Sequence, residues 1–208
     1  MIPKIIHQIW VGDFKIPYRE KQLTQKIKEY HPNFDYIFWT DAPSLPRNIQ
    51  FWYDEFYKIK NYAFCADLLR LWAIKEYGGF YLDIDFDPSN SLDDFLQNDG
   101  LILYHNNSDM TVPNNVFAAK PNLSLLNFCI EEIKTENNWY GPSWLGATVK
   151  KYLNLPYEVT HDEVKQKLKQ QNIEYFAYNI FEEKYARHMS LYSWSPEVWE
   201  KLNKGEQL

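Results

Sequence analysis

The stretch that decides the fold is residues 63–87, which read AFCADLLRLWAIKEYGGFYLDIDFD. Residues 63–77 place apolar side chains at helical spacing, and the glycine pair at 78–79 is a signal that ends a helix. Residues 80–86 then alternate in the manner of a β-strand. We therefore expect a helix over 63–77 that leads through a glycine turn into a strand over 80–86.

The rest of the chain repeats this alternation of strands and helices. We expect strands near 4–10, 36–39, 101–104 and 116–119, and helices near 18–30, 51–59, 123–137, 143–153 and 161–171. The last forty residues or so are rich in aromatic side chains and give no clear pattern. Units of this order predict an α/β fold with a mostly parallel central sheet flanked by helices.

The expected strand at 80–86 gathers acidic residues on one of its faces. Because strand side chains point alternately to two faces, Asp83, Asp85 and Asp87 would lie on the same side as Tyr81. Several carboxylates on one face repel each other and are costly to bury unaided. A hard divalent cation such as Mn²⁺ or Mg²⁺ relieves that cost, since it binds carboxylate and phosphate oxygens. We expect a ligand site at this carboxyl end of the sheet.

Asp67 and Arg70 lie three positions apart in the preceding helix, so they share a helix face. If this helix packs beside the acidic strand, Arg70 brings a positive charge close to the carboxylates. The alternative is a structural ion pair on a solvated face, and the spacing alone does not choose between the two.

Composition excludes some classes of protein. The net charge is −6 and no basic run stands out, which disfavours nucleic acid as a partner. We see no transmembrane segment and no signal peptide, and therefore expect a cytoplasmic protein, peripheral at the membrane if its acceptor is lipid-linked. Aromatic residues make up 18% of the chain, a share that suits stacking on sugar rings and bases as well as filling a core.

The residues named so far resemble a known family. Residues 66–70 and 77–85 are similar to the D-x-x-R…Y-G-G-x-Y-x-D-x-D signature of the DXD-containing sugar transferases, which are of the glycosyltransferase family 32 type. Residues 2–10 (IPKIIHQIW) and 36–41 (YIFWTD) resemble the opening strands of the same family, in the same order. That family includes fungal initiating α-mannosyltransferases and bacterial capsular-polysaccharide transferases.

The resemblance implies a GT-A type, Rossmann-like fold in a single domain over residues 1–208. Within it, a nucleotide-sugar-binding core would span about residues 1–120, and an acceptor side with a closing C-terminal element would span about residues 121–208. The implied activity is metal-dependent transfer of a sugar from a UDP- or GDP-sugar to a glycan or lipid-linked hydroxyl acceptor, with retention of configuration. Mn²⁺ or Mg²⁺ would be the cofactor.

The resemblance also assigns roles to residues of the donor site. Ile9 and Trp10 would hold the nucleotide base, with the indole stacked on it, and Asp67 and Arg70 would contact hydroxyls of the donor sugar. Tyr81 and Asp83 would contact the ribose or the sugar, and Asp85 would ligate the metal directly, with Asp83 beside it. Asp67, Arg70, Asp83 and Asp85 are accordingly the expected catalytic set. Asp87 lies outside the motif and could either support the site or face solvent.

Further along the chain the resemblance is confined to short segments. Asn114 and Asn115 resemble a segment that lines the substrate site. Residues 185–188 and 193–194 resemble a C-terminal element that contains a histidine followed by Ser-Trp, so His188 would complete the metal shell and Trp194 would close over the donor phosphates. An ordinary structural role is the alternative for His188. His7, within the first strand, is expected to be a packing or hydrogen-bonding residue rather than a base.

Three other functions could be considered for a chain with these acidic motifs. A catalytically inactive sugar-nucleotide-binding protein would have the same motifs. A DxD phosphohydrolase is disfavoured because Phe86-Asp87-Pro88 replaces the polar turn that usually follows its nucleophile. A calcium loop of the EF-hand type fails, since its sixth and twelfth positions would be Pro88 and Asp94 rather than Gly and Glu.

Overall fold

A six-stranded sheet forms the centre of the protein in the computed structural model, which describes residues 1–105, 112–133, 141–156 and 158–189. The strand order is β2-β1-β3-β6-β5-β7, and β6 runs antiparallel to both of its neighbours while the other pairs are parallel. The strands of this sheet are β1 (Ile5–Ile9), β2 (Asp35–Trp39), β3 (Gly79–Leu82), β5 (Leu101–His105), β6 (Val116–Ala119) and β7 (Ile173–Ala177). The predicted α/β class with a mostly parallel sheet is confirmed.

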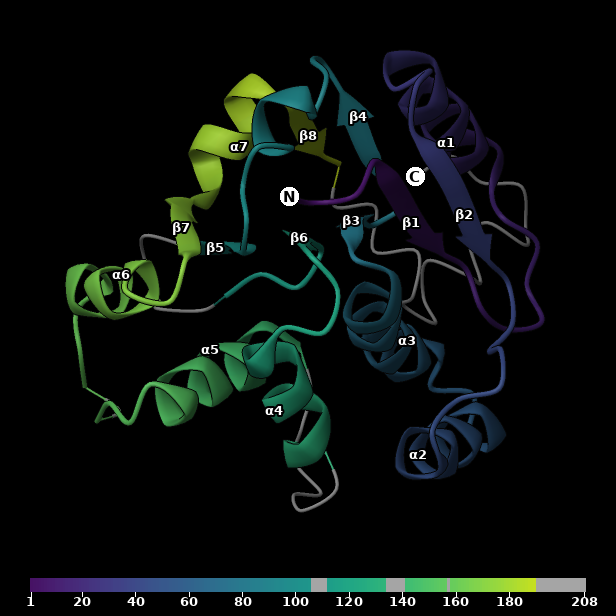
Figure 1. Cartoon of the computed structure of the whole chain (residues 1–208). Helices are drawn as coiled ribbons and strands as arrows, with labels where there is room; N and C mark the ends of the chain where they lie inside the picture. Colours follow the sequence, from purple (N-terminus) through teal and green to yellow (C-terminus); the bar gives the residue numbers. More distant parts are fainter. Residues whose placement is uncertain (106–111, 134–140, 157, 190–208) are drawn as a thin grey trace.

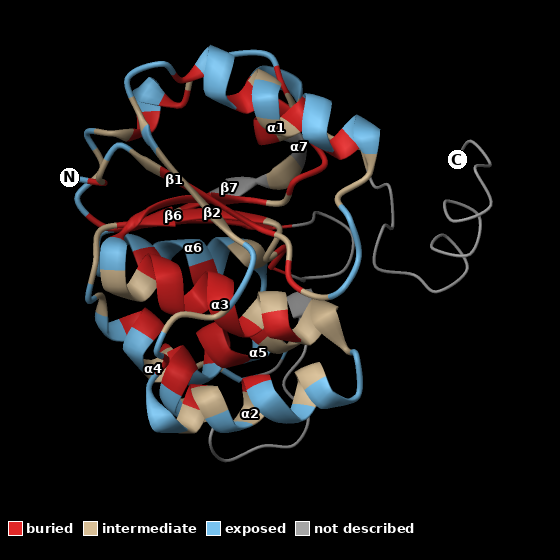
Figure 2. Cartoon of the chain, turned by 90° about the vertical axis from the view of Figure 1, so that its right-hand side faces the viewer, coloured by how far each residue is buried: buried red, intermediate tan, exposed pale blue. Residues whose placement is uncertain are grey.

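Helices cover both faces of the sheet (Figure 1). In Figure 2, α1 and α7 lie on one face and α2 to α6 on the other. The helices are α1 (Tyr18–Tyr30), α2 (Arg47–Lys58), α3 (Tyr62–Tyr77), α4 (Ser124–Glu132), α5 (Gly141–Tyr152), α6 (His161–Lys169) and α7 (Tyr178–Lys184), with a short 3₁₀ helix η1 (Asp93–Phe95). No helix within these described ranges is long and apolar enough to cross a membrane.

Two apolar clusters, one on each face, bury the sheet on both sides. The larger contains Leu68, Trp72 and other residues of α3 with residues from α2, α4, α5 and α6, and the smaller contains Ile27 of α1 and Phe181 of α7. Every residue of β3 is buried, because this central strand has a helical layer above and below it. A strand that is covered on both faces carries apolar side chains on both, which is the pattern expected of a doubly covered sheet.

The junction between α3 and β3 explains the glycine pair. Gly78 ends α3 at φ 67°, and its N–H donates to the carbonyl of Ile74. Gly79 has φ 93°, and a Cβ on this residue would lie 2.5 Å from the carbonyl oxygen of Ile5 in β1. Only glycine tolerates both the backbone angle and the close approach. The pair therefore lets α3 lie directly against the sheet and brings β3 into register with β1.

The predicted strand over 80–86 is wrong in its second half. β3 ends at Leu82, residues 83–85 form a turn, and β4 (Phe86–Pro88) pairs with β8 (Ala186–His188) in a separate two-stranded antiparallel sheet. The reason is tertiary, since β6 begins opposite Leu82 and β1 is paired with β3 only at Ile6 and His7. The ladder between β3 and β6 therefore ends at Leu82, and the chain leaves the main sheet.

Candidate metal and substrate site

The turn at residues 83–85 is fixed through its backbone by three different elements. The N–H of Asp83 donates to the carbonyl of Asn115 at 2.8 Å, just before β6. The carbonyl of Asp83 accepts a hydrogen bond from the Gln8 side chain of β1 at 3.1 Å. The carbonyl of Asp85 accepts one from the N–H of Met189, after β8, at 2.9 Å. The turn thus lies at the carboxyl edge of β1 and β3, where the sequence predicted a ligand site.

Because the expected strand is broken here, the third acid does not belong with the other two. Asp87 lies in β4 and makes an ion pair with Lys26 of α1, with both side chains partly exposed. The prediction that Asp83, Asp85 and Asp87 share one strand face is therefore wrong. The strand that contains Asp87, β4, instead pairs with the antiparallel strand β8. Strand β8 brings a different side chain to the site.

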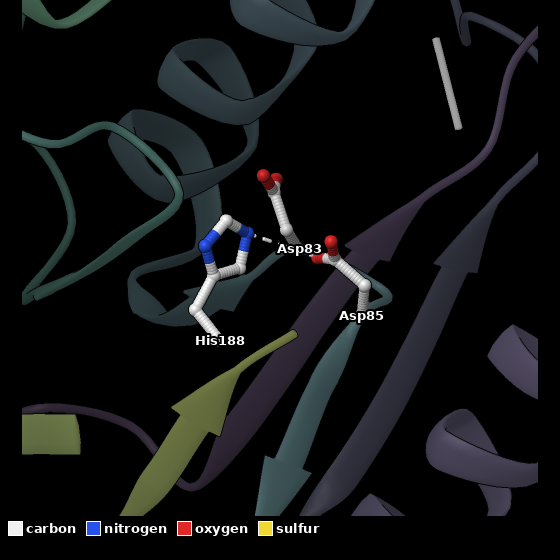
Figure 3. A group of neighbouring side chains, drawn as sticks. All are labelled: Asp83, Asp85 and His188. Carbon is white, nitrogen blue, oxygen red and sulfur yellow. Dashed lines mark ion pairs between the residues drawn. The ribbon is translucent and has the colours of Figure 1, made fainter. Parts of the chain in front are cut away.

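That side chain is His188. The ligand atoms of Asp83, Asp85 and His188 all lie within 4.8 Å of one another, and Figure 3 shows the three side chains converging. Nε2 of His188 is 3.2 Å from Oδ1 of Asp85, and its backbone N–H donates to the Glu182 carboxylate of α7 at 3.1 Å. Burial opposes protonation of the imidazole, but the hydrogen bond to Asp85 and the negative charges of Asp85, Asp83 and Glu182 together outweigh it and raise the pKa of His188.

Arg70 is the buried cation of the site, with 7% of its surface exposed. Its guanidinium lies 3.3 Å from Oδ1 of Asp67 and 3.4 Å from Oδ1 of Asp83, and it donates to the carbonyl of Asn114 at 2.8 Å. The Asn114 side chain in turn donates to Asp67 at 2.8 Å. Burial disfavours the guanidinium charge, but the carboxylates outweigh this and raise the pKa of Arg70. The i, i+3 spacing on α3 therefore produces a buried network and not a solvated ion pair.

Negative charge at the turn exceeds what Arg70 balances. Burial raises the pKa of Asp83, Arg70 opposes this rise, and the charge of Asp85 adds to it. The hydroxyl of Tyr81 donates to Oδ1 of Asp83, and the Tyr81 ring lies under the guanidinium, 4.6 Å from ring centroid to Cζ of Arg70. Two partly buried carboxylates beside one imidazole form a donor set that fits a divalent cation. Carboxylate oxygens suit Mg²⁺ and Mn²⁺ alike, and a neutral imidazole nitrogen is a common ligand of transition-metal ions.

The residues expected to bind the base lie at the end of β1, on the same edge of the sheet. The side chain of Ile9 is buried in the larger apolar cluster. Trp10 is partly buried, and its indole N–H donates to the carbonyl of Phe14 at 2.8 Å. Trp194 lies outside the described residues. The base-binding role of Ile9 and Trp10 stays a prediction.

Two side chains near the turn were not predicted. The hydroxyl of Tyr178, the first residue of α7, accepts a hydrogen bond from the Asn115 amide at 2.7 Å. Glu20 in the first turn of α1 is 1% exposed, and burial raises the pKa of its carboxyl, with the charge of Asp85 adding to the rise. An acid in a first helical turn is common, and Tyr178 falls in the segment without a clear pattern. The sequence therefore contained no signal for either residue.

Comparison with known proteins points to one family. Residues 17–102 match the family model described as a glycosyltransferase sugar-binding region containing a DXD motif. The chain is 30% identical over 146 residues to mannosyl phosphorylinositol ceramide synthase CSH1 of Saccharomyces cerevisiae, in an alignment covering 68% of this chain and 38% of that protein. It is 27% identical over 174 residues to inositol phosphoceramide mannosyltransferase 1 of Schizosaccharomyces pombe, covering 76% of this chain and 54% of the relative.

The fold is similar to that of a solved structure, PaToxG Glycosyltransferase. The TM-score is 0.63 at 17% identity, over 82% of this chain and 85% of that one. At this identity the likeness concerns the fold, which is of the GT-A type. The chain spans about half the length, or less, of the curated relatives named above.

Proposed function

Because this chain belongs to the DXD-containing sugar transferases and has a GT-A fold, we propose that it transfers a sugar from a nucleoside-diphosphate sugar to a hydroxyl acceptor. The observation that carries the proposal is the convergence of Asp83, Asp85 and His188, whose ligand atoms lie within 4.8 Å of one another at the carboxyl edge of the sheet. These residues would hold Mn²⁺, or Mg²⁺, at the diphosphate of the donor.

The neighbouring polar network supports a place for the donor sugar beside the proposed metal site. Asp67, Arg70 and Asn114 are already bonded to one another, so their polar atoms are held in place before a ligand arrives. Preorganised groups of this kind bind hydroxyls without paying again for their own ordering. We assign Asp67 and Arg70 to the hydroxyls of the donor sugar, with Asn114 and Asn115 lining the adjacent part of the site.

The chemistry follows from charge. A bound divalent cation supplies a Lewis acid that stabilises the negative charge of the leaving diphosphate. Arg70 lies 3.4 Å from Asp83 and adds a fixed positive charge at the same edge of the sheet. His188 must be neutral to act as a ligand, because a protonated imidazole has no free lone pair. We propose that transfer retains configuration, as the family resemblance implies, and assign no general base.

The hypothesis that this protein is a phosphohydrolase has less support than the transferase hypothesis. It would use Asp83 as the nucleophile, but Oδ1 of this residue is engaged by the Tyr81 hydroxyl and lies 3.4 Å from Arg70.

The names of the fungal relatives point to mannose as the donor sugar and to an inositol phosphoceramide as the acceptor. We propose a nucleoside-diphosphate mannose as the first donor to test and a lipid bearing an inositol phosphate as the first acceptor.

The test is turnover of the donor by the purified protein. GDP-mannose and a panel of UDP-sugars would be incubated with Mn²⁺ or with chelator, and release of the nucleoside diphosphate would be measured. We expect slow Mn²⁺-dependent hydrolysis of one donor, lost in Asp85→Asn and kept in Asp87→Asn, a matched acid that lies in β4 beside Lys26. Binding of a donor without hydrolysis or transfer to any acceptor would indicate an inactive binder. Absence of any Mn²⁺-dependent binding would refute the proposed site.

A further inference from the structure

Strand β1 contains two adjacent polar side chains that are completely buried, His7 and Gln8, each with 0% of its surface exposed. Because successive strand residues point to opposite faces, the two act on opposite sides of the sheet. A buried polar group is costly unless it is hydrogen-bonded. Both side chains are hydrogen-bonded, and in the same way. Each bonds to one side chain on β2 and to one backbone carbonyl next to β3.

The Gln8 arrangement ends at the metal turn. The hydroxyl of Tyr36 on β2 donates to Oε1 of Gln8 at 2.6 Å, and Nε2 of Gln8 donates to the backbone carbonyl of Asp83 at 3.1 Å. The carbonyl of Asp83 can only accept, so the amide nitrogen of Gln8 must face it and the amide oxygen must face Tyr36. The Asp83 carbonyl thus fixes the orientation of the Gln8 amide, and the Tyr36 hydroxyl, which can donate or accept, donates to the amide oxygen.

The His7 arrangement ends at the other end of β3. The indole N–H of Trp39 donates to Nδ1 of His7 at 3.1 Å, and Nε2 of His7 bonds to the carbonyl of Gly78 at 2.9 Å. Since an indole N–H only donates, Nδ1 accepts and Nε2 must carry the proton. His7 therefore holds the carbonyl that precedes β3, whereas Gln8 holds the carbonyl that follows it.

We propose that Gln8 is a positioning residue for the metal site, acting through the backbone of the turn at 83–85. Gln8, Asn115 and Met189 form hydrogen bonds with the backbone of that turn, and of these three Gln8 contributes a side chain whereas Asn115 and Met189 contribute backbone groups. The carbonyl it binds belongs to the peptide bond between Asp83 and Ile84, which sets the direction of the chain from one carboxylate to the next. Loss of this contact would leave Asp83 and Asp85 attached but less well aligned with His188. The inference rests on the proposed metal site.

His7 provides a matched control for Gln8, because each makes a hydrogen bond to a backbone carbonyl at one end of β3. Gln8→Met removes the contact with Asp83 at similar volume, and His7→Met removes the equivalent contact with Gly78. Tyr36→Phe is a milder variant that frees only the Gln8 oxygen. Each protein would be confirmed folded by far-UV circular dichroism, and the dissociation constant for Mn²⁺ alone would be measured from free Mn²⁺ by electron paramagnetic resonance. Melting temperatures would be recorded with chelator and with Mn²⁺.

We expect Gln8→Met to weaken Mn²⁺ binding about tenfold, the lower end for partners that orient metal ligands. Tyr36→Phe should weaken it by about threefold, the worth of one hydrogen bond. His7→Met should lower the melting temperature in chelator yet leave the Mn²⁺ affinity unchanged. Equal Mn²⁺ affinity in Gln8→Met and the unaltered protein, or an equal loss in the two Met variants, would overturn the inference. If Gln8→Met does not fold, the Mn²⁺ affinity of Tyr36→Phe is the test instead, and an affinity equal to that of the unaltered protein would overturn the inference. No Mn²⁺ binding by the unaltered protein would instead refute the proposed metal site itself.

Discussion

The buried imidazole of His7 should make the stability of this protein fall as the pH is lowered. His7 is 0% exposed, and burial lowers the pKa of its imidazole to about 4, although the hydrogen bond to the Gly78 carbonyl opposes the shift. In the unfolded chain the same group has its ordinary pKa of about 6.5. Between these two values the unfolded state binds a proton that the folded state does not.

The sign and size of the effect follow from this difference. Because the unfolded state gains the proton, the free energy of unfolding decreases as the pH falls through 6.5 and continues to decrease down to about 4. Integration between pH 7.5 and 5 gives a loss of about 2 kcal/mol from His7, and the full loss below pH 4 is about 3 kcal/mol. Burial also lowers the pKa of His31, which adds a loss of the same sign in the same direction.

The contribution of His7 is isolated by comparison with a variant. Urea unfolding of the unaltered protein and of His7→Met would be followed by tryptophan fluorescence in chelator at several pH values from 7.5 to 5. His7→Met should be less stable at pH 7.5, but its free energy of unfolding should fall by about 2 kcal/mol less over this range. His31 and the carboxylates titrate in both proteins and cancel in the comparison. If the two proteins lose stability in parallel, the imidazole is not held neutral by the fold and the reasoning fails.

Three further outcomes follow from the geometry. Gly79→Ala should destabilise the protein by at least about 2 kcal/mol, since the residue has φ 93° and its Cβ would lie 2.5 Å from the Ile5 carbonyl; urea unfolding measures this. Arg70→Met should cost about 3–5 kcal/mol in chelator by leaving buried carboxylates such as Asp83 unpaired, and Mn²⁺ should restore more stability to the variant than to the unaltered protein. Asp87→Asn should leave the Mn²⁺ dissociation constant unchanged and shift stability by less than about 1 kcal/mol, because its ion pair is partly exposed.

Local signals were sufficient for the elements around the glycine pair. The helix predicted over 63–77 is α3 at Tyr62–Tyr77, and the strands predicted at 101–104 and 116–119 correspond to β5 and β6. Helix-ending glycines, apolar periodicity and strand-forming residues act over a few positions, so they can be read without knowing what packs against them. Asp67 and Arg70 also follow from the sequence, since a spacing of three residues on a helix places them on one face.

The C-terminal elements depended on distant partners and could not be read in this way. β7 is an edge strand beside β5, and β8 pairs with β4, about a hundred residues earlier in the chain. The helix between them, α7, has seven residues, which is too short for a reliable periodic pattern. His188 was therefore reachable only through resemblance to the family.

The error in the strand at 80–86 and the composition of the metal site have one cause. Alternation along these residues could not reveal where the strand ends, because apolar side chains on both sides of the break, Leu82 before it and Ile84 and Phe86 after it, are all buried. On a continuous strand, Asp83 and Asp85 would stand about 6.5 Å apart along the chain, with Asp87 as the third acid on that face. The break after Leu82 takes the chain out of the main sheet, and its next strand, β4, is free to pair with β8.

The pairing of β4 with β8 replaces Asp87 by His188 as the third side chain of the candidate metal site. Phe86 lies opposite His188 in the β4–β8 ladder, so the residue immediately after the turn sets the register that places the imidazole beside Asp85. Asp87, opposite Arg187, is left on the far side with Lys26. Three carboxylates would have offered oxygen ligands only, whereas two carboxylates and an imidazole offer oxygen and nitrogen together. The end of β3 thus determines that the third side chain beside the two carboxylates is an imidazole, through a strand that the local sequence does not predict.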